Sequence, residues 1–518
     1  MILRSSDRQH IQPTTPDPLF ATDHLMESLG GRTARGGAIT VISHGLRFVI
    51  SIVATSILAR LLTPQDYGLI GMVAVVTNFV GMFKDLGLSL ATVQRPEITR
   101  SQISTLFWLN MTLSLVTMLV LVAISPAISW FYSEPRLEVI AVISAFGFVI
   151  GGFTVQHEAL IKRQMRFYAL SAISLASIVT GYTVGIILAW NGFGFWALIY
   201  SQLALLMTNA FLVWSICRWR PGLPSRNTGI RSMVSFGGHI TAYSTINYFA
   251  KNADSVLIGK FWASAPLGLY NKAAQLVGLP TEQVTEPLMG VVIPSLSRLA
   301  GTPDRYRKAY LRIMEKILIL VMPTVGLIIV TSDWLIAIVL GKQWNGAAPI
   351  LLFMSIAGLF QPLIGTAGWL LVTQGRGRDM LHWSLINAPI SILSIVAGLG
   401  WGAVGVAASY SVARILIAQP LIYWFVGRRG PVTTKDFYRV LAPFTLATLL
   451  GIATCTVFRH FVAAINPILG LLICAPIMFA STILVLSAMR SGRAALMDVK
   501  NTILLLTGSR AANTATVA

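Results

Sequence analysis

Apolar runs of about twenty residues follow one another along almost the whole chain, and only short polar connections separate them. A helix that crosses the hydrocarbon core of a bilayer needs about 20 mostly apolar residues. Only 11% of the 518 residues are charged, whereas soluble domains carry about 25%. The sequence therefore predicts an all-α, polytopic membrane protein. It excludes a secreted enzyme, a nucleic-acid-binding protein and a single-span receptor, because no connection is long enough to hold a folded soluble domain.

The apolar runs between polar breaks predict fourteen transmembrane helices. They lie near 38–60, 67–90, 103–125, 137–156, 167–190, 194–216, 233–258, 266–297, 310–330, 347–371, 380–400, 402–426, 437–458 and 465–488. The run at 334–340 is too short to cross a bilayer, and we expect it to be re-entrant or interfacial.

The basic residues predict the orientation of these helices. An even number of spans puts both termini on one side of the membrane. Of the 39 Lys and Arg residues, 28 fall in tails and loops on that side and 5 on the other. Cytoplasmic loops carry an excess of Lys and Arg, so both termini are predicted to be cytosolic. The net charge of +20 then reflects topology and does not indicate a nucleic-acid partner.

The two halves of the chain show weak similarity at matching places. Ser-Ile-Leu at 56–58 precedes Gly-Leu at 68–69, and Ser-Val-Leu at 255–257 precedes Gly-Leu at 268–269. Chance similarity between Leu-rich helices is the alternative. Because six spans is an even number, duplicated halves would be parallel repeats. We predict a disordered cytosolic tail, two parallel six-helix lobes, two C-terminal helices and a second cytosolic tail, with boundaries at 1–36, 37–217, 218–430, 431–489 and 490–518.

Charged residues inside the predicted spans mark the candidate site, because a charge at the bilayer centre costs several kcal/mol or more. Arg47 shares one helical stripe with Ser51 and Thr55. It either lines a cavity or extends its side chain to the cytosolic surface. Arg414 lies near the middle of its span, too deep to reach the surface easily, so we expect it to face the protein interior.

The spans near 233–258 and 266–297 carry the remaining candidate charges. Lys251 and Asp254 are three residues apart on one helix face. They either neutralise each other, or Asp254 titrates while Lys251 contacts an anionic substrate. The following span contains three prolines and is predicted to be bent. Lys272 and Glu282 lie along it.

Cations outnumber carboxylates in this set, which suits an anionic substrate such as a diphosphate. The candidate substrate-binding residues are Arg47, Lys251, Lys272 and Arg414, and Asp254 and Glu282 are candidates for ion coupling or pairing. The sequence has no GxxxxGK[ST] phosphate loop and no Cys–His cluster, so we expect no ATP hydrolysis, no metal and no cofactor. The chain is predicted to be a carrier and not an enzyme.

Several segments together resemble a known family. They are ILARLLTPQDYG at 57–68, FKDLGL at 83–88, FWLN at 107–110, NYFAKNADSVLIG at 247–259, LGLYNKA at 267–273 and PSLSR at 294–298. The chain is similar to the Wzx-type polysaccharide and lipopolysaccharide flippases of the multidrug/oligosaccharidyl-lipid/polysaccharide exporter superfamily. The resemblance covers roughly residues 36 to 430.

This resemblance implies a V-shaped pair of lobes that works by alternating access in the bacterial inner membrane. The implied cargo is an undecaprenyl-diphosphate-linked oligosaccharide repeat unit, moved from the cytosolic to the periplasmic leaflet. Implied partners are this lipid, the bilayer, and the polysaccharide polymerase and chain-length machinery. Family members line the cavity with cations, for which Arg47, Lys251 and Lys272 are candidates; Arg414 matches no family motif.

Two other functions stay open at this point. An ion-coupled drug or metabolite exporter on a related fold would use buried carboxylates such as Asp254 and Glu282. A membrane scaffold or a polysaccharide polymerase is the third class, although polymerases generally need larger outer loops than this sequence has.

Overall fold

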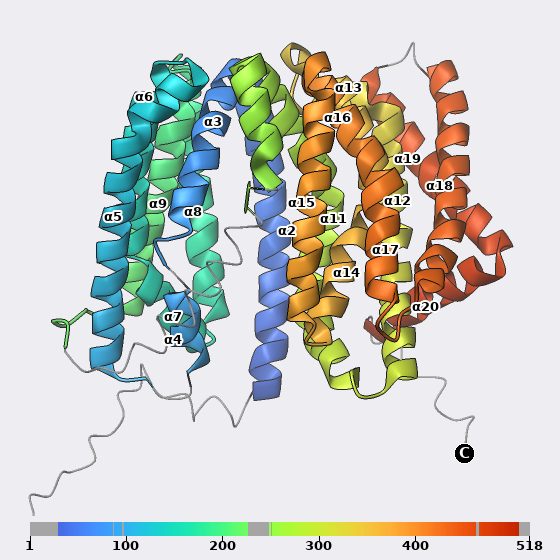
Figure 1. Cartoon of the computed structure of the whole chain (residues 1–518), viewed down its shortest axis with the longest axis horizontal. Helices are drawn as coiled ribbons and strands as arrows, with labels where there is room; N and C mark the ends of the chain where they lie inside the picture. The colour runs from blue at the N-terminus through green and yellow to red at the C-terminus, as the bar shows by residue number, and fades with distance from the viewer. Residues whose placement is uncertain are drawn as a thin grey trace, which may run out of the picture.

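The computed structural model describes residues 29–85, 87–95, 98–225, 248–249, 251–462 and 466–506, and these residues form helices joined by short turns (Figure 1). The helices are α2 (Leu29–Leu61), α3 (Pro64–Gly81), α4 (Leu88–Gln94), α5 (Arg100–Tyr132), α6 (Arg136–Gly152), α7 (Val155–Arg163), α8 (Phe167–Trp190), α9 (Trp196–Cys217), α11 (Ser264–Leu299), α12 (Pro303–Val339), α13 (Ala347–Gly358), α14 (Gln361–Thr373), α15 (Gly377–Gly398), α16 (Gly402–Ala413), α17 (Gln419–Gly427), α18 (Thr434–Val462), α19 (Pro467–Ala488) and α20 (Arg490–Leu506). A further helical segment covers residues 251–262.

The prediction of an all-α polytopic membrane protein is confirmed. Nine helical segments of the described chain are long and apolar enough to cross a membrane, and the bent pair α13 and α14 would make a tenth. One of the nine, Gly377–Gly427, covers two of the predicted spans. The predicted span near 233–258 falls largely outside the described residues.

Two groups of helices stand side by side (Figure 1). The first lobe contains α3 to α9, and α2 packs on it through α8. The second lobe contains α11 to α17, and α18 and α19 pack against each other and against α12. The arrangement of two lobes with two added C-terminal helices is therefore confirmed.

The lobes meet along α3 and α11, where two glycines allow the backbones to approach closely. A Cβ on Gly68 would overlap the carbonyl of Ser264, and a Cβ on Gly268 would overlap the carbonyl of Pro64. The two contacts are reciprocal. Pro64 and Gly68 lie one helical turn apart on α3, and Ser264 and Gly268 lie one turn apart on α11. We call Pro64, Gly68, Ser264 and Gly268 the α3–α11 seam. Small residues of this kind let membrane helices pack tightly, and here they come from matching places in the two halves.

The last carbonyls of α2 are satisfied by the other lobe. The indole Nε1 of Trp344 donates to the carbonyl of Ala59 at 2.7 Å, and the Gln343 amide donates to that of Leu62 at 2.8 Å. Arg60 donates in the opposite direction, to the carbonyl of Ile338 at 2.7 Å. The final carbonyls of a helix have no partner within it, so these bonds hold the lobes together at the same end as the seam.

The structure adds three details to the sequence prediction. Helix α2 begins at Leu29, so residues 29–36 are helical and not part of a disordered tail; residues 1–28 lie outside the described structure. The run at 334–340 is not re-entrant, because it forms the end of α12 after a kink at Thr331. Residues 490–506 form α20, which an ion pair between Lys316 and Asp498 (2.9 Å) fastens to α12.

A buried network of polar side chains fixes the break between α3 and α4. The Asn110 amide of α5 donates to the Asp85 carboxylate at 3.2 Å and to the Lys84 carbonyl at 3.3 Å. The Gln156 amide donates to Asn110 at 2.7 Å, and the Thr92 hydroxyl donates to Gln156 at 2.9 Å. Buried polar groups are costly unless they are hydrogen-bonded, so Asn110 stabilises the chain where α3 ends.

We predict that Asn110→Leu destabilises the protein by about 1–3 kcal/mol, because Gln156 and Asp85 would lose a buried partner. The measurement is denaturant unfolding of the detergent-solubilised protein, followed by tryptophan fluorescence. Thr112→Val on the same helix is the control, since Thr112 is exposed and bonds only to the carbonyl of Trp108. Equal stability of the two variants would contradict the prediction.

Candidate functional site

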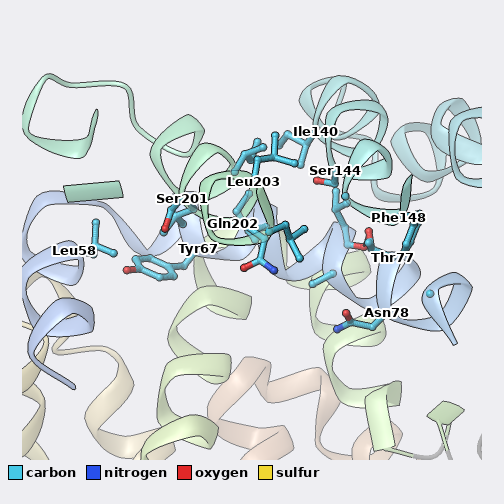
Figure 2. A pocket seen from close by; sticks show the side chains of 18 of the residues that line it. Leu58, Tyr67, Thr77, Asn78, Ile140, Ser144, Phe148, Ser201, Gln202 and Leu203 are labelled. Carbon is cyan, nitrogen blue, oxygen red and sulfur yellow. Dashed lines mark hydrogen bonds between the residues drawn. The ribbon is translucent and has the colours of Figure 1, made fainter. Parts of the chain in front are cut away.

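The first cavity lies within the first lobe and is closed on one side by α11. Its volume is about 730 Å³. Figure 2 shows polar side chains entering it from α3, α6 and α9 between apolar ones. The polar lining residues are Thr55, Tyr67, Thr77, Asn78, Lys84, Ser144, Tyr182, Ser201, Gln202, Lys272 and Gln275. Among the described residues, this lining contains two lysines and no carboxylate.

The second cavity lies on the side of the second lobe and has a volume of about 600 Å³. It is lined by the segment 251–262 and by α14, α15, α16 and α17. The polar lining residues are Tyr248, Lys251, Asp254, Trp383, Ser384, Asn387, Ser391, Tyr410 and Arg414. Two cations and one carboxylate therefore face this space.

The two cavities adjoin each other at Met82, which lines both. Next to it the Phe79 ring packs on Tyr248 and Phe249, with ring centroids 5.7 and 4.8 Å apart. The Tyr248 hydroxyl donates to the carbonyl of Val75 at 2.6 Å. We call Phe79, Met82, Tyr248 and Phe249 the apolar partition.

Arg414 faces the second cavity from a distorted part of its helix. Residues Arg414–Ala418 form a π-helical turn between α16 and α17, and Pro420 follows it and lacks a backbone N–H. Arg414 donates to the hydroxyl of Tyr410, while its buried Nε has no hydrogen-bond partner among the residues that the structure describes. Turns of this type often occur at functional sites. The expected inward orientation of Arg414 is thus seen, whereas its role stays a prediction.

Lys251 and Asp254 both line the second cavity, but these two described residues form no ion pair with each other. Asp254 instead accepts from the backbone N–H of Ser255 at 2.7 Å and from the Tyr270 hydroxyl at 2.9 Å. The structure therefore does not show the neutralised pair that the sequence left open, and Lys251 lines the cavity without it.

Lys272 lies in the first cavity, on the other side of the partition from Lys251. Its ammonium is 4.2 Å from the centre of the Tyr67 ring and donates to Gln275 at 3.1 Å. A cation over an aromatic face is attracted by the ring electrons, so Tyr67 and Gln275 hold this charge at the wall between α3 and α11.

Arg47 and Glu282 line neither cavity. Arg47 donates to the Ser174 hydroxyl of α8 at 3.0 Å and to the carbonyl of Ser43. One turn further on, Ser51 bonds to the Tyr182 hydroxyl at 2.9 Å. The polar stripe of α2 therefore faces α8 and leads to the first cavity. Glu282 is exposed on α11.

Lys84 is a cavity residue that the sequence analysis did not single out. It follows α3 in the FKDLGL segment, and Asn110 holds its backbone carbonyl. Its ammonium lies 3.0 Å from the position of a Cβ on Gly151, so this glycine makes room for it. Lys84 lies near the end of a predicted span, where lysines commonly reach the membrane surface, so its position alone did not indicate a cavity residue.

The arrangement suits binding more than covalent chemistry. In the described part of the chain no group of three or more His, Cys, Asp or Glu residues could hold a metal ion. The three cysteines are buried and free. The cavities instead present cations, amides and hydroxyls, which bind anionic and hydroxyl-rich ligands.

A comparison with protein families decides the identity. The profile of the polysaccharide biosynthesis protein family matches residues 57–349. The chain belongs to this family. This family agrees with the resemblance of its motifs to the Wzx-type polysaccharide and lipopolysaccharide flippases.

Similar proteins of known name agree with this assignment. The teichuronic acid biosynthesis protein TuaB of Bacillus subtilis is 27% identical over 82% of this chain and 89% of its own length. The lipopolysaccharide biosynthesis protein WzxC of Escherichia coli is 22% identical over 83% of this chain and 87% of its own length. The succinoglycan biosynthesis transport protein ExoT of Rhizobium meliloti is 21% identical over 84% of this chain and 88% of its own length.

Solved structures share the fold. The lipid II flippase MurJ in an inward closed conformation has a TM-score of 0.66 and 12% identity, over 86% of this chain and all of its own. An inward-facing multidrug resistance transporter of the MATE family has a TM-score of 0.58 and 12% identity, over 76% of this chain and 95% of its own.

We predict that Gly68→Val opens the α3–α11 seam, because the new side chain would overlap the Ser264 backbone. Overpacking of this kind costs about 1–3 kcal/mol, which corresponds to a change in population of roughly 5- to 150-fold. The assay is labelling of Gln202→Cys in the first cavity by an impermeant maleimide, added to spheroplasts from the predicted periplasmic side. The labelling rate should rise.

Gly290→Val is the control on α11, since a Cβ there meets nothing within 4 Å. It should leave the labelling rate unchanged. An unchanged rate in Gly68→Val as well would mean that the seam does not control access.

Proposed function

We propose that this protein is a flippase that moves undecaprenyl-diphosphate-linked oligosaccharide repeat units from the cytosolic to the periplasmic leaflet of a bacterial inner membrane. The product serves exopolysaccharide, capsule or lipopolysaccharide synthesis. The observation that carries the proposal is a pair of adjoining cavities whose described walls contain Lys84, Lys251, Lys272 and Arg414 and a single carboxylate, Asp254. Relatives named for teichuronic acid, lipopolysaccharide and succinoglycan synthesis support the same cargo class.

The cations would attract and hold the anionic headgroup. Arg binds phosphate oxygens through its planar fork, and Lys acts as a point charge. The hydrocarbon around the protein makes an unpaired charge costly, so a cavity with surplus cations favours an anionic ligand. Arg47 adds positive charge beside the first cavity, at the cytosolic half of α2 in the predicted orientation.

Transport would proceed by alternating access. In the structure the lobes touch at the seam and at the hydrogen bonds from Gln343 and Trp344 to the end of α2. We assign this end to the periplasmic side, from the distribution of basic residues. The state would then be inward-facing, and release of the cargo would need the seam to separate.

An ion-coupled drug or metabolite exporter is the second candidate, and Asp254 is the observation in its favour. This carboxylate lines the second cavity beside Tyr270, in a place where a coupling ion would bind. Glu282, the second candidate for ion coupling, does not line that cavity. Resistance to cationic drugs upon overexpression, lost in Asp254→Asn, would support this candidate.

The direct test is a lipid extract of cells that lack the gene, compared with the parent by mass spectrometry. We expect undecaprenyl-diphosphate oligosaccharide to accumulate and surface or secreted polysaccharide to disappear. An unchanged lipid pool with normal polysaccharide in a strain without a second flippase would refute the proposal.

We predict that Arg414→Ala and Lys251→Ala each reduce polysaccharide export at least tenfold while the protein inserts normally. The loss of one charge-assisted hydrogen bond, worth about 1.5–3 kcal/mol, accounts for this magnitude. Polysaccharide yield and membrane abundance are measured together. Arg428→Ala is the control, because Arg428 stacks on Trp424 and Phe425 at the end of α17 and lines neither cavity.

A combined variant sharpens the test. Substitution of Arg47, Lys251, Lys272 and Arg414 together by Ala should abolish export. Full export by this variant would show that the cationic mechanism is wrong.

A further inference from the structure

We infer that the first cavity is a separate binding site for the saccharide part of the cargo, while the diphosphate binds in the second cavity. This inference rests on the proposed function and adds a division of labour between the two cavities. The argument uses the side chains that line each cavity, the partners they already have and the partition between them.

The first cavity presents groups that both donate and accept hydrogen bonds. Asn78 and Gln202 enter it from α3 and α9 (Figure 2). Neither amide bonds to another protein group in the part of the chain that the structure describes. An amide carries two donors and an acceptor, and a sugar hydroxyl also does both. Both amides are exposed to the cavity, so a ring with several hydroxyls can bond to them in place of water.

Apolar and aromatic walls flank these amides. Tyr67, Ile140, Phe148 and Leu203 surround the same space (Figure 2). Ligand pockets combine such apolar walls with a few placed polar groups, and a volume of about 300–1,000 Å³ is typical. The 730 Å³ of the first cavity lies in this range and suits the apolar faces and polar rims of sugar rings.

The charges of the first cavity do not require a phosphate. Lys272 already has Tyr67 and Gln275 as partners. Lys84 lies against Gly151 at the end of the cavity, where its ammonium can donate to hydroxyls. Two lysines act as separate point charges and do not form the planar fork that matches phosphate oxygens.

The second cavity is the better place for the diphosphate. Arg414 lines this space, and among the described residues Tyr410 is the hydrogen-bond partner of its side chain, so donors of the guanidinium are left for phosphate oxygens. Lys251 lines the same space without an ion pair to Asp254, which is held by Ser255 and Tyr270. An Arg fork and a nearby ammonium are a strong combination for phosphate oxygens.

The partition fits a ligand whose two parts are covalently joined. Met82 lines both cavities, so the two spaces adjoin at this residue. The first sugar of the cargo is bonded directly to the diphosphate. A headgroup that spans Met82 would place its sugars beside Gln202 and its phosphates beside Arg414.

The experiment measures which probe protects which cavity. Gln202→Cys marks the first cavity and Asn387→Cys the second, and the buried native cysteines give a low background. The purified full-length variants in lipid nanodiscs are treated with a small methanethiosulfonate. The probes are inorganic diphosphate and the free saccharide that mild acid releases from the lipid accumulated in cells lacking the gene.

We expect the saccharide to slow modification of Gln202→Cys at least fivefold and to leave Asn387→Cys nearly unaffected, and diphosphate to do the reverse. Protection of Gln202→Cys by diphosphate, or no protection of it by the saccharide, overturns the inference. A second pair of variants tests binding without an introduced cysteine. Asn78→Leu removes an amide from the first cavity, and Ser384→Ala removes a hydroxyl from the second. Only Asn78→Leu should weaken saccharide binding measured by calorimetry.

Failure of this inference can be told apart from failure of the proposed function. If cells lacking the gene accumulate no lipid-linked saccharide, the proposed function itself is wrong. If the lipid accumulates and the protection pattern is reversed or mixed, the flippase assignment stands and the assignment of the cavities is wrong.

Discussion

Lipid hydrocarbon offers no hydrogen bonds, and this constraint governs the rest of the structure. Every backbone group inside the membrane must find a partner within the protein, so the described chain is built from helices. The same constraint makes each polar side chain costly. It explains why the last carbonyls of α2 accept from Gln343 and Trp344 of the other lobe, and why Asn110 sits at the centre of a connected buried network.

The seam shows how the two halves of the chain use one sequence feature twice. Gly68 and Gly268 come from matching places, and each receives a backbone carbonyl of the other helix. A contact built from close backbone packing gains many weak dispersion contacts and few strong bonds. Such a contact can separate and re-form without breaking a buried ion pair, which suits an interface that must alternate between two arrangements.

The apolar runs were sufficient to predict the fold, but they did not determine the site. The spans and the two lobes follow from length and composition, whereas the bend expected at the three prolines stays a prediction, because α11 runs as one helix from Ser264 to Leu299. The rotation of each helix about its axis follows from packing, which a single sequence does not record. Arg47 therefore faces Ser174 instead of a cavity, and Lys251 lies apart from Asp254. Lys84, Asn78 and Gln202 carried no signal, because lysines at span ends and amides within spans are common.

The π-helical turn at Arg414–Ala418 has a structural consequence beyond the arginine itself. Such a turn contains one residue more than an α-helical turn would, and each residue rotates an α-helix by about 100°. The extra residue therefore rotates the side chains of α17 about the helix axis relative to those of α16, within one span. The half that packs on α13 and the half that approaches α18 can each present its own apolar face. Loss of one residue here would turn one half against its neighbours and carry Arg414 away from the cavity wall.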